Sequence, residues 1–126
     1  MRGIAFWFFF TATLYFLAGM VWGIVMAASD DHSLMPAHAH LNLIGGVVSA
    51  LAGLYYHLVP KAGAHWLAKA HFALAMLGIL TMVPGIVLVL TGQGEVLAKV
   101  GSILTLGAML LFTMNVLKFR TSAEFV

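Results

Sequence analysis

Four long apolar stretches, separated by short polar segments, dominate the pattern of the chain. They cover about residues 4–28, 36–59, 70–91 and 96–118. Each offers roughly the 20 apolar residues that an α-helix needs to cross the hydrocarbon core of a membrane. The first stretch is too long for the apolar region of a secretory signal peptide, and no clear cleavage site precedes Asp30. The pattern therefore predicts an all-α integral membrane protein with four transmembrane helices.

The amino-acid composition also indicates a membrane protein and excludes several kinds of cofactor. Of the 126 residues, 63% are hydrophobic and only 8% are charged. A soluble domain of this size could not bury so much apolar surface, so lipid must cover part of it. The absence of cysteine excludes disulfides, iron–sulfur clusters and covalently attached c-type haem. The net charge of +2 comes from residues near the helix ends and does not indicate nucleic-acid binding. We expect one transmembrane domain over residues 1–126.

The charged residues divide between the two ends of the predicted helices. Most basic residues gather at one end and most acidic residues at the other: Arg2, Lys61, Lys69, Lys118 and Arg120 against Asp30, Asp31 and Glu95, with Lys99 as a mild exception. Loops rich in lysine and arginine face the cytoplasm in membrane proteins. The pattern predicts both termini in the cytoplasm, in an inner (cytoplasmic) membrane of the bacterial type.

The second apolar stretch opens with two histidines, in the sequence Pro36-Ala37-His38-Ala39-His40. An ionisable side chain inside a membrane is costly, so it is by default a hypothesis of function. Two residues along an α-helix turn through about 200°. His38 and His40 should therefore point to opposite sides of one helix, and they are poorly placed to hold one metal ion together.

The two predicted faces of this helix differ in chemistry. His38 shares its face with small and polar residues, including Asn42, Gly45 and Ser49, whereas the His40 face is branched aliphatic. A haem needs an axial imidazole and an apolar wall, and either face could supply part of such a pocket. The candidate cofactor-binding residues are His38, His40, Asn42, Gly45, Gly46 and Ser49. The alternative is that the glycines serve helix packing and each histidine bonds to a neighbouring helix.

Further soft or basic ligands lie elsewhere in the sequence. His57 and His71 fall at the cytoplasmic end, where histidine can reach water, and form a possible second site. His57 lies roughly 26 Å along the helix from His40, so the two cannot share a site. Several methionines, Met20, Met26 and Met35 among them, fall near the depth of His38. They are either soft metal ligands or packing residues.

Residues 37–60 resemble a specific element of a known family. The Ala37-His38-Ala39-His40 opening, Gly46, Gly53 and the Leu58-Val59-Pro60 close are similar to the tenth helix of subunit I of the haem–copper oxidases and nitric oxide reductases. The second helix of that subunit is similar too. The resemblance implies one third of the twelve-helix architecture of subunit I. His38 matches a high-spin haem ligand in the tenth helix and a low-spin haem ligand in the second helix, and His40 matches the other low-spin ligand.

The resemblance implies a function for the chain. We expect a b-type haem protein that binds haem b and serves electron transfer or haem-based redox sensing. Because the two histidines lie on opposed faces, the haem iron would be held by His38 of one protomer and His40 of the next. Closed symmetry is usual for homo-oligomers, and three copies would rebuild a twelve-helix assembly, so a homotrimer is favoured. A quinol or a cytochrome is the expected electron partner.

Other functions stay open. The copper centre of that family requires a histidine followed by a tyrosine on one helix and a His-His pair on another, and neither arrangement occurs in this sequence. We therefore expect no reduction of oxygen or nitric oxide. One alternative is a copper-binding or nitric-oxide-response membrane protein without haem catalysis, since the twelve-span nitric-oxide-response proteins also carry His-Ala-His. Another is a structural or assembly subunit that binds neither haem nor copper.

Overall fold

The computed structural model describes residues 1–121, so residues 122–126 of the expected domain lie outside the described part. Within residues 1–121 the secondary structure is helical, without strands. Four stretches are long and apolar enough to cross a membrane: Gly3–Ser29, Met35–Leu58, Trp66–Leu90 and Val96–Lys118. This confirms the prediction of an all-α chain with four helices of membrane-spanning length.

The four stretches differ in regularity. Three are single helices: α1 (Gly3–Ser29), α5 (Trp66–Leu90) and α6 (Val96–Lys118). The second changes geometry twice and consists of α2 (Met35–His40), a π-helix η1 (Leu41–Val48) and α3 (Ser49–Leu58). A short helix, α4 (Pro60–Ala64), connects α3 to α5. The third stretch begins earlier than the expected residue 70, because Nδ1 of His65 accepts a hydrogen bond from the Leu67 backbone N–H and caps α5.

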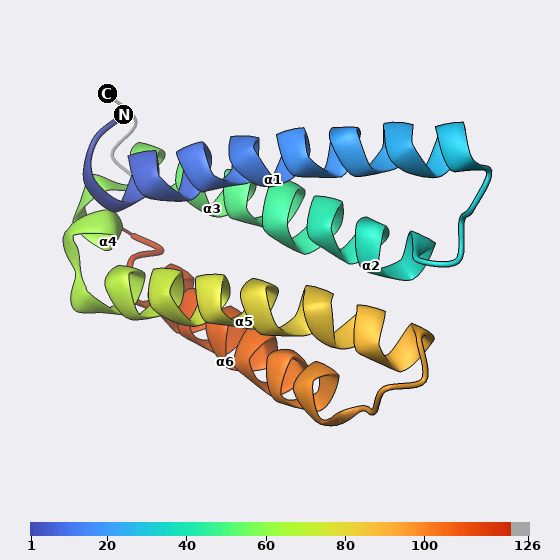
Figure 1. Ribbon diagram of the computed structural model, residues 1–126. Helices are drawn as coiled ribbons and strands as arrows, with labels where there is room; N and C mark the ends of the chain where they lie inside the picture. The colour runs from blue at the N-terminus through green and yellow to red at the C-terminus, as the bar shows by residue number, and fades with distance from the viewer. Residues whose placement is uncertain (122–126) are drawn as a thin grey trace.

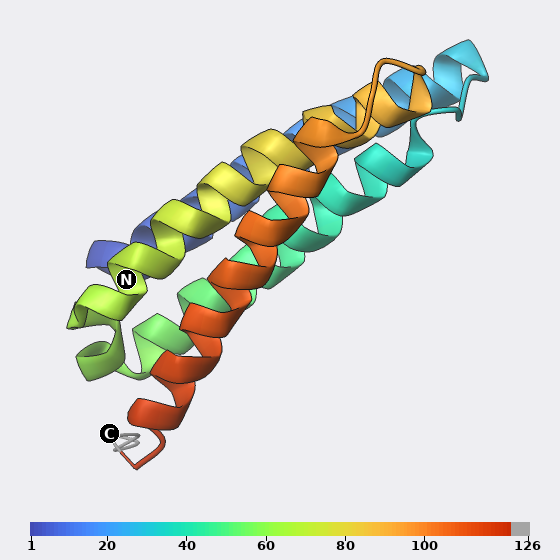
Figure 2. The same ribbon diagram turned by 90° about the horizontal axis from the view of Figure 1, so that it is seen from below.

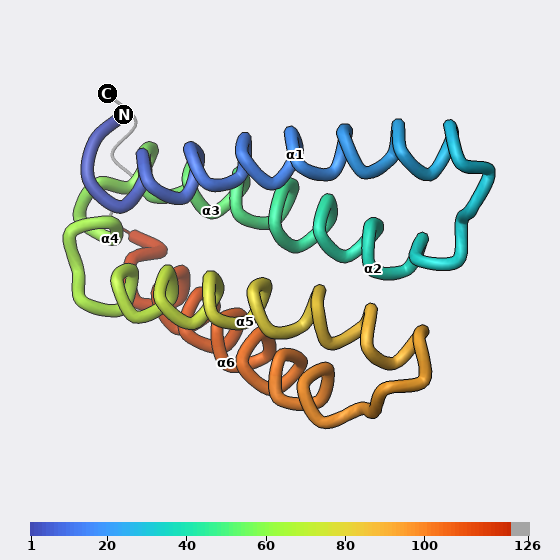
Figure 3. Tube along the Cα trace, in the orientation of Figure 1, coloured from blue at the N-terminus to red at the C-terminus, as the bar shows by residue number. Residues whose placement is uncertain are grey.

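The helices form two antiparallel hairpins that run along a common direction (Figures 1 and 2). In the first, α1 packs along η1 and α3; in the second, α5 packs along α6. The trace in Figure 3 shows the start of α1, the α4 segment and the end of α6 at one end of the bundle. The loops that follow α1 and α5 lie at the other end. The predicted separation of basic and acidic residues thus matches the two ends of the bundle.

Glycines set the separation between the helices of the second hairpin. A methyl group on Gly101 of α6 would overlap the backbone of Met82, and one on Gly85 of α5 would overlap the backbone of Ala98. Small residues of this kind let helix backbones approach closely within a membrane. The α5–α6 pair is therefore held by contact between the backbones themselves.

The outside of the bundle is apolar. Large hydrophobic side chains such as Ile24 of α1 and Ile103 of α6 are largely exposed. The buried residues instead include many small ones, among them Ala5, Ala52 and Ala68. A water-soluble protein rarely exposes so much contiguous apolar surface, whereas lipid solvates it at no cost. The fold therefore suits a multi-pass membrane protein.

Candidate cofactor site around His38 and His40

The imidazole of His40 has the arrangement that metal-binding histidines commonly adopt. Its Nδ1 lies 2.7 Å from the carbonyl oxygen of Pro36, one turn earlier on the same helix. A neutral imidazole donates its hydrogen to this carbonyl from Nδ1, so the lone pair remains on Nε2. Hydrogen bonding of one ring nitrogen to a backbone carbonyl fixes the tautomer and the ring orientation in such ligands. The lone pair on Nε2 of His40 is thus free to bind a metal ion.

The side of the helix that carries His40 faces outward. Leu43 and Leu51 on this side are 57% and 58% exposed, and Val47 between them is also exposed. No hydrogen bond joins His40 to another helix within residues 1–121. In a single chain, His40 therefore stands at the edge of an apolar stripe that only lipid or another molecule can cover.

His38 points the other way, into the bundle. Its Nε2 lies 2.9 Å from the carbonyl oxygen of Gly19 on α1, and its ring meets Trp22 edge to face, with the centroids 6.0 Å apart. A methyl group on Gly23 would come within 3.3 Å of the same nitrogen. Gly19 and Gly23, spaced four residues apart, therefore make room on α1 for the imidazole. Sequence reasoning overlooked this pair, although a Gly-x-x-x-Gly spacing in an apolar helix signals a close helix contact.

Asn42 completes the inner side of the site. Its side-chain N–H donates a 2.9 Å hydrogen bond to the backbone carbonyl of His38, and its amide lies over Gly19. Asn42 therefore closes the turn that carries His38 and fills the notch beside it.

The other three candidate residues lie further along the chain, against α1 and within the helix itself. Gly45 packs against the ring of Tyr15 and Gly46 against the ring of Phe16. Ser49 is buried, and its hydroxyl donates a 3.2 Å hydrogen bond to the carbonyl of Ile44. Protein side chains thus fill the space beside the two glycines, and a role for these three residues in cofactor binding stays a prediction.

The π-helix η1 begins directly after His40. At its other end, the Ser49 hydroxyl donates a hydrogen bond to the carbonyl of Ile44, five residues earlier in the chain. Extended π geometry is rare in proteins and is concentrated at functional sites. Its position next to the two histidines marks this part of the second span as the least ordinary segment of the fold.

An open groove of about 620 Å³ runs beside His38 between α1 and α2. It is lined by small residues, methionines, two histidines and one amide: Gly19, Met20, Gly23, Met26, His32, Met35, His38, Ala39 and Asn42. His40 is not part of it, so the groove and the outward face hold one of the two histidines each. Within residues 1–121 no three His, Asp or Glu side chains come together as a ready metal site.

The loop before α2 is ordered by a local turn. The backbone N–H of Ser33 donates a 3.0 Å hydrogen bond to the Asp31 carboxylate. Hydrogen bonds from the side chain and backbone of Ser33 lower the pKa of the Asp31 carboxyl below its ordinary value. The ionised carboxylate therefore stabilises the turn that leads into the histidine segment.

The two histidines fit an iron-bound haem to different degrees. His40 can bind through Nε2 without any change. His38 has its Nε2 on the Gly19 carbonyl, so the imidazole must turn towards the groove that it already lines. Both residues fit, provided that this one side chain rotates.

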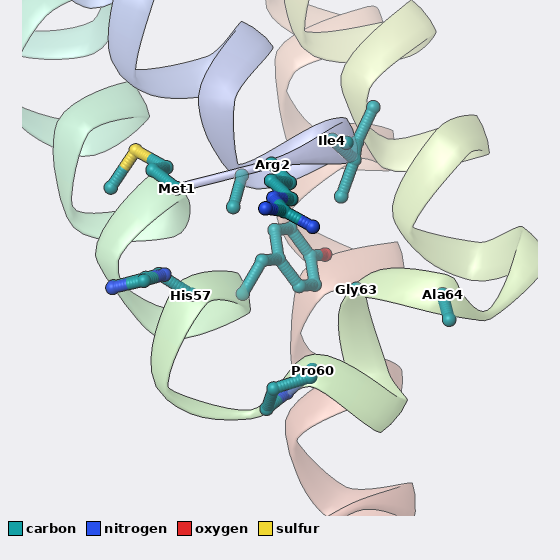
Figure 4. A pocket seen from close by; sticks show the side chains of 10 residues that line it. Met1, Arg2, Ile4, His57, Pro60, Gly63 and Ala64 are labelled. Atoms are coloured by element: carbon teal, nitrogen blue, oxygen red, sulfur yellow. The ribbon is translucent and has the colours of Figure 1, made fainter.

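The histidines at the other end of the bundle lie in separate surroundings. His57 is exposed beside a pocket of about 460 Å³, together with Arg2 and Pro60 (Figure 4). His71 is only 3% exposed, and its Nδ1 lies 2.9 Å from the hydroxyl of Tyr56. The prediction that His71 reaches water is wrong, because the rings of Phe8 and Phe112 enclose it. The two histidines line different cavities, and a second site formed by them stays a prediction.

Comparison with known proteins adds no relative. No protein-family model matches the chain, and neither a curated protein nor a solved structure is similar to it.

Proposed function

We propose that the chain is a b-type haem-binding membrane protein that carries electrons or senses redox state. The observation that carries the proposal is the imidazole of His40, with Nδ1 on the Pro36 carbonyl and Nε2 free on an apolar outer face. The haem, when bound, would supply one-electron redox chemistry. The resemblance of residues 37–60 to the haem-binding helices of oxidase subunit I supports the same assignment, and it makes the chain one third of that architecture.

His38 of a neighbouring copy would be the second histidine that holds the haem. His40 faces out of the bundle and His38 faces the groove, so one chain does not clasp one iron with both residues. The outward face of one protomer would meet the groove of the next, and a ring of three would place one such junction at each interface. The homotrimer follows the three-fold repeat of the resembling family and the preference of oligomers for closed symmetry.

A haem held by one histidine from each of two protomers would supply electron transfer rather than binding of a gas. The paired histidines of the family's copper centre have no counterpart in the sequence, so the proposal includes no reduction of oxygen or nitric oxide. A quinol or a cytochrome is the proposed electron partner.

The proposed membrane is the bacterial-type inner membrane, with both termini in the cytoplasm. The basic ends of the helices, which the positive-inside rule places in the cytoplasm, coincide with the end of the bundle where α1 begins and α6 ends. A fluorescent reporter that matures only in the cytoplasm, fused after Val126, should be active. Activity of a periplasm-specific phosphatase at the same position would reverse the topology.

Spectroscopy of the detergent-purified protein tests the haem assignment. His38→Ala and His40→Ala should each abolish the low-spin haem spectrum, because each removes one axial ligand from every interface. His57→Ala is the matched control and should leave the spectrum unchanged, since His57 lies at the other end of the bundle. Loss of haem should also weaken the trimer in mass measurements, because the cofactor bridges chains. An unchanged low-spin spectrum in either single variant would overturn the interfacial site.

A copper-binding function is the second candidate, and the composition of the groove favours it. Three thioethers and two imidazoles line the same space: Met20, Met26, Met35, His32 and His38. Sulfur and imidazole are the ligands that Cu(I) prefers. Purified protein that contains one copper ion per chain and shows no Soret band would support this function or the related nitric-oxide response. The copper should then be lost in Met26→Leu, because this substitution removes a thioether from the groove. A chain that binds neither haem nor copper would be a structural or assembly subunit.

A further inference from the structure

A third, smaller cavity lies between the two hairpins. Its volume is about 130 Å³, and its wall is apolar except for the imidazole of His71 and the hydroxyls of Ser49 and Thr105. An apolar cavity of about 150 Å³ is large enough to bind benzene. The space therefore matches one six-membered ring.

His71 gives this cavity a polar contact. The hydrogen bond of its Nδ1 to Tyr56 is the one bond that the imidazole makes within residues 1–121. Within the same residues Nε2 makes no hydrogen bond, and His71 as a whole is only 3% exposed. The cavity is the space in which a partner for this nitrogen can sit.

We propose that the cavity binds the ring of a neutral, lipid-soluble phenol or quinone, whose ring oxygen pairs with Nε2 of His71. When the Tyr56 hydroxyl donates to Nδ1, Nε2 carries the hydrogen and can donate to a quinone carbonyl. When Nδ1 carries the hydrogen and donates to Tyr56, Nε2 can accept from a phenol hydroxyl. Tyr56 is thus a positioning residue that lets one histidine serve both chemical forms.

The rest of the wall excludes charged and strongly hydrated ligands. The hydroxyls of Ser49 and Thr105 already donate to the carbonyls of Ile44 and Gly101. A water molecule in such a site needs two to four polar partners, which this wall supplies poorly. Met109 at the rim is 42% exposed, so the ring can enter from the lipid side. The site would give the quinol proposed above as an electron partner a place to bind, so in this respect the inference rests on the proposed function, although binding of the ring needs no haem.

Three probes with the same decyl tail test the proposal on the full chain in lipid nanodiscs. They are a decyl-1,4-benzoquinone, 4-decylphenol and decylbenzene, and only the last lacks a ring oxygen. Quinone and phenol should bind about five- to tenfold more tightly than decylbenzene, which is the worth of one hydrogen bond. Both should also shift the ¹⁵N resonance of His71 Nε2, and binding of only one of them would identify the source. Equal affinity for all three probes, with no shift, would overturn the site.

Two variants and a control locate the binding. His71→Phe should remove the preference for oxygen-bearing rings, because it keeps the ring and deletes the nitrogen. Ala108→Leu should abolish binding of all three probes, because the larger side chain fills the cavity. This second variant keeps the Tyr56–His71 hydrogen bond, so it tests the site even if His71→Phe does not fold. His57→Phe lies in the other pocket and should change nothing. The same preference in His40→Ala would show that the site is independent of haem; undiminished binding in Ala108→Leu would contradict the proposal.

Discussion

The two hairpins use glycine in opposite ways. In the first, glycines in the outer half face side chains of the neighbouring helix: Gly19 faces Asn42, Gly23 faces His38, Gly45 faces Tyr15 and Gly46 faces Phe16. In the second, Gly85 and Gly101 face backbone atoms of the partner helix. Near the α4 end the first hairpin also comes to backbone contact, because Gly53 packs against Phe9 and Ala5.

This difference in packing makes the second hairpin the rigid part of the bundle and leaves the outer half of the first hairpin, which holds the candidate site, adjustable. Side chains can change rotamer, whereas a helix backbone in contact with another can move only if the whole helix moves. The α5–α6 pair therefore has one arrangement. The outer half of the first hairpin keeps its two helices together through groups that can rearrange, and His38 and Asn42 are among them. Candidate chemistry lies where the packing is adjustable.

The largest effect should come from the rigid hairpin. Gly101→Ala places a methyl group against the backbone of Met82, and we expect it to lower the free energy of unfolding by about 3 kcal/mol. Gly107→Ala on the same helix is the matched control, because its methyl group would meet only the Leu74 side chain, at 3.9 Å. It should be neutral or stabilising by up to about 1 kcal/mol. Equal losses in denaturant titrations of the two variants in mild detergent would break the comparison.

A smaller loss of stability, with a larger effect on the site, is expected from Gly19→Ala. The new methyl group overlaps the Asn42 amide, which can turn away, so the cost should be about 1–2 kcal/mol. Displacement of Asn42 removes its bond to the His38 carbonyl and disturbs the groove. Cofactor content should therefore fall in this variant while it stays near wild type in Gly107→Ala. If Gly19→Ala were as unstable as Gly101→Ala, the first hairpin would be no more adjustable than the second.

Ser49→Ala should cost about 1 kcal/mol, because it leaves the Ile44 carbonyl of the π-helix without its buried hydroxyl partner. Ser102 of α6 makes a similar hydrogen bond, to the Ala98 carbonyl, but is exposed. Ser102→Ala should therefore change stability by less than about 0.5 kcal/mol. Thermal unfolding of the two variants compares them directly, and equal shifts would remove the distinction.

The smallest effect concerns pH at the acidic end of the first hairpin. The pKa of Asp31 is lowered in the folded chain by Ser33, so its contribution is complete above the ordinary carboxyl pKa and is lost as the pH falls below it. Acidification should lower the protection factor of the Ser33 amide, that is, the exchange rate of an unstructured amide at the same pH divided by its own, and leave the protection factors in α5 and α6 unchanged. Asp31→Asn should make the protection factor of the Ser33 amide independent of pH, because the asparagine side chain does not titrate. A Ser33 amide with the same response in both chains would contradict the role of the carboxylate.

The helical spans could be predicted from the sequence because lipid imposes a simple demand for length and apolarity. The opposed directions of His38 and His40 also followed from helix geometry alone, and the structure places them so. Local periodicity fixes such features, and they do not depend on which helices are neighbours.

Features that depend on pairing between helices could not be predicted in this way. Gly19 and Gly23 become part of the site only because α1 lies beside α2. The burial of His71 depends on Phe8 and Phe112, which come from two other helices. The π geometry of η1 likewise has no local sequence signature of its own. The haem ligands, the trimer and the membrane orientation stay predictions.

The π-helix also gives the second span spare length. A wider turn accommodates more residues for the same rise, so the segment that carries the histidines is one that could lengthen. Conversion of one π-turn to α geometry would advance α2 by about 1.5 Å and rotate it by about 100°. The Tyr56 end of the span could remain fixed during such a step, because Gly53 and Tyr56 are anchored against α1 and α5. A change of one π-turn to α geometry would therefore turn the imidazoles of His38 and His40 to a new direction while the helix that carries them stays folded.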